Sequence, residues 1–175
     1  LIVDEVQTGF GRTGDHWWGH QHADLKPDIM TMAKGIANGM PLSAVATTPE
    51  IAASAVGQGL SLSTFGGNPL GSAIGRAALG VIKEEKLVDQ SRDLGAYFKG
   101  RLERIESEHI TEVRGRGLFI GVELNTRARP FCEALQDRGI LCKETHATVI
   151  RFAPPLVITK AQIDWAMDHI EAVLG

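Results

Sequence analysis

The chain has 175 residues, of which 43% are hydrophobic and 22% are charged, a composition typical of a globular protein with its own core. Its formal net charge of −3 gives no indication of a nucleic-acid or anionic-membrane partner, and no apolar run approaches the length of a membrane span. Cys132 and Cys142 form no CxxC or metal-binding pattern, which predicts free thiols in a reducing compartment.

The first third of the chain predicts short buried strands joined by loops. Apolar runs at 1–3, 29–33 and 42–48 have the length and composition of strands in a parallel sheet that is covered on both faces. The stretch 7–28 is rich in Gly, His and Trp and predicts a loop or a short helix. Pro49 then predicts the start of a helix.

The middle of the chain predicts two helices. Gly66, Gly67 and Pro69 predict a turn, after which small and apolar residues recur at helical spacing. The many Gly and Ala residues on this helix indicate tight packing, and the 20 glycines of the chain indicate close backbone approaches, such as one to a ligand. A second amphipathic helix is predicted over 86–106.

The last third predicts a small α+β arrangement. The segment "ITEVRGRGLFIGVEL" alternates, so it predicts a hairpin with Arg114 and Arg116 on its polar side, in preference to a basic phosphate loop. A helix that stops at Gly139 follows, then strands over "ILCKE" and "TVIRFAPPL". Thr159 is expected to cap a last helix.

Two local patterns resemble ligand sites and favour other interpretations. "GFGRTG", Gly9 to Gly14, matches a dinucleotide-binding turn, but no helical period follows it before Pro27, as that motif requires. His16, His20 and His22 could share a metal only with further ligands, and no Cys or carboxylate stands at a telling spacing. We therefore expect a polar loop here and no metal site.

Asp4 and Lys34 form a more specific combination. Each follows an apolar strand, and the carboxyl ends of strands are where α/β sheets place their ligands. An amine and a carboxylate held there match pyridoxal phosphate, because a lysine forms the Schiff base and an acid pairs with the protonated pyridine nitrogen. Either residue alone would be interpreted as a solvated strand end.

Four segments, in order and at matching spacing, resemble the class III (omega) aminotransferases, which are fold-type I pyridoxal phosphate enzymes. They are "LIVDEVQTGFGRTG", "PDIMTMAKGIANGMPLSAV", "STFGGNPL" and "VIRFAPPL". Within this family, the segment "HWWGHQHADLKPDIMTMAKGIANGMP" is most similar to alanine–glyoxylate aminotransferases. The segments "RGRGLFIGVEL" and "ARPFCEALQDRGILCKETHATVIRFAPPLVIT" are most similar to ornithine aminotransferases.

The resemblance implies a role for six residues. It implies that Lys34 is the Schiff-base lysine and the proton shuttle between the substrate Cα and the cofactor C4′, and that Asp4 is the partner of the pyridine nitrogen. It further implies a clamp for the α-carboxylate of the substrate, and a guanidinium fork suits such a bidentate ion pair. The remaining implied roles are Val6 packing on the cofactor ring, Gln7 donating to its phenolic oxygen, Thr64 binding phosphate in the neighbouring subunit's site, and Arg151 forming the clamp.

The resemblance also implies a domain organisation. We expect a partial α/β fold of type I: residues 1–67 as the end of the large-domain sheet, 68–106 as connecting helices, and 107–175 as a small C-terminal α+β domain. Because Leu1 opens directly into a strand, we expect a piece of a longer chain that lacks much of the cofactor pocket.

The implied activity is the transfer of an amino group, the δ-amine of ornithine in our preferred interpretation, to 2-oxoglutarate or another oxo acid. Alternatives are alanine–glyoxylate or β-alanine transamination, and a catalytically inert truncated chain. A homodimer in the cytoplasm is expected, with a mitochondrial matrix location left open, and with neither nucleic acid nor membrane as a partner.

Overall fold

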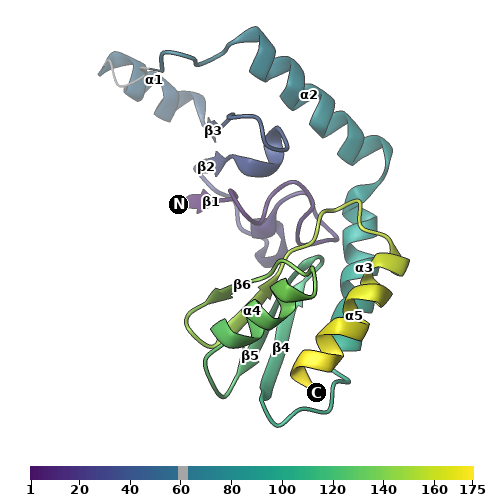
Figure 1. The fold of residues 1–175 in the computed structure, drawn as a ribbon. Helices are drawn as coiled ribbons and strands as arrows, with labels where there is room; N and C mark the ends of the chain where they lie inside the picture. The colour runs from purple at the N-terminus through teal and green to yellow at the C-terminus, as the bar shows by residue number, and fades with distance from the viewer. Residues whose placement is uncertain (59–62) are drawn as a thin grey trace. The chain divides into compact units, whose positions relative to one another are not determined.

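The computed structural model of the chain describes residues 1–58 and 63–175 and divides them into two compact units (Figure 1). Unit 1 comprises Leu1–Gly11 and His16–Leu87, and unit 2 comprises Arg12–Asp15 and Val88–Gly175. Each unit has one sheet. The strands of unit 1 carry the purple and blue colours of Figure 1, and those of unit 2 are teal to green.

The sheet of unit 1 has three strands in the order β1-β2-β3. They are β1 (Ile2–Asp4), β2 (Ile29–Met32) and β3 (Ala44–Thr47). β1 and β2 run parallel, as predicted. β3 runs antiparallel to β2, so the prediction that the strand at 42–48 joins a parallel sheet is wrong. Only a short connection separates β2 from β3, and a parallel crossover needs a dozen or more residues, usually with a helix.

The predicted burial of these strands is also wrong within the described chain. Ile2 is 67% exposed and Val45 is 66% exposed. An apolar run predicts burial only when other elements cover both faces of the sheet, and the α2 helix of this unit packs instead against the η2 turn. The apolar composition therefore identifies strands correctly without fixing how deeply they are buried.

The helices of unit 1 begin where the sequence predicts. Thr48 accepts a hydrogen bond from Ile51 N at the start of α1, and Asn68 accepts one from Gly71 N (2.7 Å) at the start of α2. Gly75 lets α2 approach the Leu42 side chain closely, because a Cβ there would lie 2.8 Å from Leu42 Cδ2. The helical elements are η1 (Gly19–Ala23), η2 (Lys34–Ile36), α1 (Pro49–Gly57) and α2 (Pro69–Glu84).

Unit 2 contains a four-stranded antiparallel sheet in the order β4-β5-β7-β6, with the predicted hairpin formed by its first two strands. One sheet face carries Ile120, Val122 and Ile150, which are almost fully buried. The strands are β4 (Ile110–Arg116), β5 (Phe119–Leu124), β6 (Lys143–Thr145) and β7 (Val149–Phe152).

Three helices supply the rest of the core of unit 2. They are α3 (Leu87–Leu102), α4 (Arg129–Asp137) and α5 (Lys160–Leu174). Leu102, Leu135, Met167 and Ile170 are fully buried and join the apolar sheet face in one cluster. Among the residues that the structure describes, no helix is long and apolar enough to cross a membrane.

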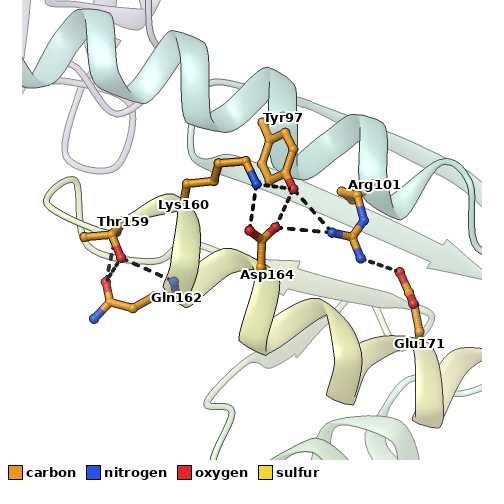
Figure 2. A network of polar contacts seen from close by, with 7 residues as sticks. All are labelled: Tyr97, Arg101, Thr159, Lys160, Gln162, Asp164 and Glu171. Atoms are coloured by element: carbon orange, nitrogen blue, oxygen red, sulfur yellow. Dashed lines mark hydrogen bonds and ion pairs between the residues drawn. The ribbon is translucent and has the colours of Figure 1, made fainter.

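A polar network on the surface of unit 2 joins α3 to α5 (Figure 2). Tyr97 Oη on α3 donates to Asp164, and Lys160 Nζ donates both to Tyr97 Oη (2.9 Å) and to Asp164 Oδ2 (2.7 Å). Arg101 donates to Glu171 Oε1 at 3.0 Å. Hydrogen bonds from Lys160 and Tyr97 hold the pKa of Asp164 below its ordinary value. Because solvent screens these exposed ion pairs, we expect them to orient the two helices and to contribute little to the free energy of unfolding.

Both cysteines lie in unit 2 as free thiols, as predicted. Cys132 is buried on α4, and Cys142 precedes β6. Burial raises the pKa of both thiols, that of Cys142 to about 12, so both are protonated at neutral pH.

A pair of glycines allows α3 to contact the turn between β4 and β5. A Cβ on Gly95 would lie 2.2 Å from the backbone carbonyl carbon of Gly117, a separation that real atoms do not adopt. Gly117 itself has φ +53°, a conformation that favours glycine. The close approaches predicted from the glycine content are thus, at these positions, approaches of the backbone to itself.

Gly95→Ala should therefore lower the free energy of unfolding by about 3 kcal/mol, because the new methyl group forces α3 away from the turn. Gly100→Ala is the matched control on the same helix, since a Cβ there meets nothing within 4 Å. It should raise stability by about 0.5–1 kcal/mol through helix propensity. Urea unfolding measures both, and equal effects of the two changes would contradict this packing.

Candidate functional site

The pairing of β1 with β2 brings Asp4 and the segment before Lys34 to the same edge of the sheet. Asp4 ends β1 and stands opposite Thr31 in the parallel register, and Lys34 follows three residues later. The backbone continues this pairing one residue further, because Glu5 N donates to Thr31 O at 2.9 Å. The two residues that the sequence singles out therefore occupy the carboxyl ends of adjacent parallel strands.

The backbone at Lys34 is unusual. Lys34 has φ +48°, a left-handed conformation that few residues other than glycine adopt, and its side chain is exposed. Gly35 follows it, and a Cβ at that position would lie 3.2 Å from the ring of the buried Phe10. The sharp turn after β2 thus directs the chain over Phe10 and leaves the lysine at the strand end. Strained backbone of this kind often marks a functional position.

The carboxylate of Asp4 is oriented by two hydrogen bonds. Its Oδ1 accepts from Val6 N at 2.9 Å and from Thr31 Oγ1 at 3.2 Å. The first closes a local turn after β1, and the second crosses to β2. Both bonds go to one oxygen, so the hydrogen bonds described leave the orientation of Asp4 fixed while Oδ2 can accept from a further donor.

The other implied residues are distributed over both units. Val6 is half-buried and Gln7 is exposed, both in the loop that follows β1. Thr64 is exposed in the turn before α2. Arg151 belongs to unit 2, on β7, where it lines a cavity. The roles of these residues, like those of Asp4 and Lys34, stay predictions.

Glu5 is a structural residue that the sequence reasoning missed. Its side chain is fully buried, and its two oxygens accept from Thr8 Oγ1 (2.6 Å), Gly19 N (2.9 Å) and His20 N (2.8 Å). The ring nitrogen of His20 lies 2.7 Å from Oε1. Desolvation acts to raise the pKa of Glu5, but the hydrogen bonds from Thr8, His20 and Gly19 outweigh it and keep the pKa below 4.5.

Arg12 is the second missed residue, and it organises unit 2. Its guanidinium donates to the carbonyl oxygens of Leu118 (3.0 Å) and Pro154 (2.5 Å). Its own carbonyl accepts from Leu118 N (3.1 Å) and Ser91 Oγ (3.0 Å). Burial lowers the pKa of Arg12 from its ordinary value. Only a long-range contact explains this residue, so no local pattern could have identified it.

The two rejected patterns have structural explanations. After Gly14, turns and the η1 helix follow "GFGRTG", so the strand–turn–helix context of a nucleotide site is not formed. The rings of His16 and His22 are 4.9 Å apart, edge to face, and His20 contacts Glu5. Within residues 1–58 and 63–175, no group of three potential metal ligands comes together.

Comparisons with known proteins define the class. The sequence model of the family "Aminotransferase class-III" matches residues 1–174, and the chain belongs to this family. The fold is that of the type I pyridoxal phosphate-dependent aminotransferases, in partial form, as the sequence predicts. Pyridoxal phosphate is accordingly the cofactor of the family.

The individual relatives include ornithine aminotransferases. One from Exiguobacterium sp. is 53% identical over 176 residues, which is 100% of this chain and 44% of that protein. The structure of a Toxoplasma gondii ornithine aminotransferase, with partial occupancy of PLP at its active site, is 39% identical with a TM-score of 0.92 and covers 99% of this chain and 42% of its own. The structure of an acetylornithine aminotransferase from Elizabethkingia anophelis is 40% identical with a TM-score of 0.90. The match covers 99% of this chain and 45% of that protein. The chain thus spans less than half the length of these relatives.

Glu5→Gln should destabilise unit 1 by about 2–3 kcal/mol at pH 7, because the amide NH₂ faces donors that now have no acceptor. A carboxyl group whose pKa is lowered by folding stabilises the folded state at pH values above its pKa in the unfolded chain. This contribution is lost as the pH falls below about 4.5 and through the folded pKa.

The difference between wild type and Glu5→Gln should therefore shrink from pH 7 to pH 3. Thermal unfolding across this range measures it, with the exposed Glu84→Gln in the same unit as the control. A difference that stays constant with pH would contradict an ionised Glu5 in the folded state.

Proposed function

We propose that this chain carries the catalytic lysine of a pyridoxal phosphate-dependent aminotransferase, with Lys34 as the residue that bonds the cofactor. The observation that carries the proposal is the placement of Asp4 and Lys34 at the ends of adjacent parallel strands. Family membership gives independent support.

The side chains at this edge fit the cofactor chemically. Lys34 supplies a primary amine on an exposed turn, and Asp4 supplies an oriented carboxylate. A carboxylate is the partner that keeps a pyridine nitrogen protonated. When bound, pyridoxal phosphate would accept the electron pair released from the C–H bond of the substrate carbon that bears the transferred amine.

The protein groups perform the proton and charge chemistry. Lys34 Nζ would be the base that takes the proton from the substrate carbon bearing the transferred amine, which in ornithine is Cδ. Asp4 would hold a proton on the pyridine nitrogen, and hydrogen bonds from Val6 N and Thr31 Oγ1 orient its carboxylate. In the same proposal, Val6 would pack against the cofactor ring and Gln7 would donate to its phenolic oxygen.

Substrate recognition falls to Arg151, whose guanidinium would hold a carboxylate of the amino acid or oxo acid. The proposed donor is ornithine, through its δ-amine, and the acceptor is 2-oxoglutarate or another oxo acid. The identity of 53% to an Exiguobacterium ornithine aminotransferase supports this choice. Alanine–glyoxylate and β-alanine transamination are the alternatives within the family, and an inert chain is the alternative outside catalysis.

Assembly and location are part of the same proposal. We expect a homodimer in which Thr64 contacts the phosphate bound in the neighbouring subunit. A cytoplasmic location is expected, and the bacterial origin of the Exiguobacterium relative is consistent with it.

Borohydride reduction in the presence of pyridoxal phosphate should leave a pyridoxyl group on Lys34 Nζ, detectable by peptide mass spectrometry. Lys34→Ala should abolish the label, and Lys26→Ala, which removes an exposed lysine of the same unit, should not. Asp4→Asn should reduce labelling at limiting cofactor. Labelling spread equally over surface lysines would favour the inert chain.

The donor can be tested in a hybrid in which this chain replaces the matching 176 residues of the Exiguobacterium enzyme. We expect transfer from ornithine to 2-oxoglutarate to exceed transfer from alanine by at least tenfold in kcat/KM. Arg151→Lys should lower kcat/KM by about 10–100-fold, because the bidentate contact is lost. Activity with only alanine and glyoxylate would contradict the choice of ornithine and support alanine–glyoxylate transamination.

A further inference from the structure

The sheet of unit 2 has one face outside the apolar core, and a cavity of about 500 Å³ lies on that face. Side chains alternate along a strand, so the neighbours of the buried Ile120, Val122 and Ile150 point to the opposite face. The cavity is lined by Thr13, Arg114, Gly115, Arg116, Phe119, Ile120, Gly121, Thr145, His146, Val149 and Arg151.

One row of residues crosses the sheet beneath this cavity. Arg114 on β4 stands opposite Gly121 on β5, and Gly121 stands opposite Arg151 on β7. Paired residues in antiparallel strands project to the same face, so the two arginines flank a position without a side chain. Adjacent strands lie about 5 Å apart, which puts the two arginine Cα atoms about 10 Å apart.

Gly121 is not required by the backbone conformation of the strand. It is outside the positions with positive φ, and a Cβ there would meet one neighbour within 4 Å, Val149 Cγ1 at 3.2 Å. Any β-forming residue could take this backbone conformation, but Val149 would have to shift by a few tenths of an ångström to accept the Cβ. The missing side chain instead keeps the centre of the cavity floor open.

The lining of the cavity is cationic. Among the described residues that line it, Arg114, Arg116 and Arg151 carry charge at neutral pH and none is an acid. Arg114 is held at the edge by Glu123 Oε2 (2.5 Å) and Glu112 Oε2 (2.7 Å). These bonds fix the orientation of Arg114. Because its one guanidinium faces two carboxylates, the attraction of the cavity for an anion comes mainly from Arg116 and Arg151.

We infer that Gly121 is a specificity-determining residue of this cavity: its lack of a side chain opens the floor between Arg114 and Arg151 on which the carboxylate of a small molecule lies. The inference rests on the proposed function in one respect, namely that Arg151 binds the carboxylate of the substrate. The ligand class is a small carboxylate, and a side chain at position 121 excludes it by filling this space.

The test is a titration of the ¹⁵N-labelled chain with glutarate, and with glutaramide as the neutral molecule of the same length. Glutarate should shift the amide signals of Gly121, Arg114 and Arg151 saturably, and glutaramide should not. Gly121→Val should weaken glutarate binding by at least tenfold, and Gly121→Ala by about two- to fivefold. Gly100→Ala, whose Cβ meets nothing within 4 Å, should leave binding unchanged.

Circular dichroism and the dispersion of the remaining amide signals check that each variant is folded. If Gly121→Val does not fold, the glutarate affinity of Gly121→Ala tests the inference. Glutarate binding that is absent, or unchanged in both Gly121 variants, overturns the inference. Borohydride labelling of Lys34 in the same samples separates the two proposals. If Lys34 is labelled but the Gly121 variants bind glutarate as the wild type does, only this inference is wrong. If glutarate binding depends on Gly121 but Lys34 is not labelled, only the catalytic proposal is wrong.

Discussion

The parallel pairing of β1 with β2 is the constraint on which the candidate site depends. Asp4 and Lys34 are 30 positions apart in the sequence, and the register that sets Asp4 opposite Thr31 is what gathers them at one edge. A shift of one residue would turn Asp4 to the other face of the sheet. Hydrogen bonds from Thr31 Oγ1 to Asp4 and from Glu5 N to Thr31 O reinforce this register from the strand end.

Each unit adds a polar side chain that fixes a loop: the buried Glu5 in unit 1 and the half-buried Arg12 in unit 2. In unit 1, the Glu5 carboxylate holds Thr8, Gly19 and His20 around one centre, and this shapes the loop that carries Val6 and Gln7. In unit 2, Arg12 holds Leu118 at the β4–β5 turn and Pro154 after β7. Such groups are stable when every bond is made and costly when one is lost, because water cannot replace the missing partner.

Much of the fold could be predicted from the sequence, because local signals are strong. Thr48, Asn68 and Thr159 cap helices close to the expected starts, and the alternation in β4 and β5 gives a hairpin. The antiparallel direction of β3 was not predicted, because apolar composition carries no information on strand direction. The exposure of Ile2 was missed for a related reason, since covering elements are a property of the assembled structure.

The candidate site was predictable to a different degree at each residue. Asp4 and Lys34 follow from strand ends and chemistry, whereas Arg151 follows from family resemblance alone. Glu5 and Arg12 left no local signal, because their importance comes from partners that only the folded chain provides. The role of Gly121 also needs the register of three strands before it can be seen.

The path of the chain through Arg12–Asp15 has a consequence for dissection of the protein. This segment belongs to unit 2, yet both of its neighbours in the sequence belong to unit 1, so the chain passes between the units three times. A single cut after Leu87 would leave the second fragment without Arg12. Ser91 Oγ would lose its acceptor, and Leu118 N would keep only Ser91 Oγ as a partner. Neither unit is therefore a contiguous folding module, and we expect their unfolding transitions to be coupled through the backbone.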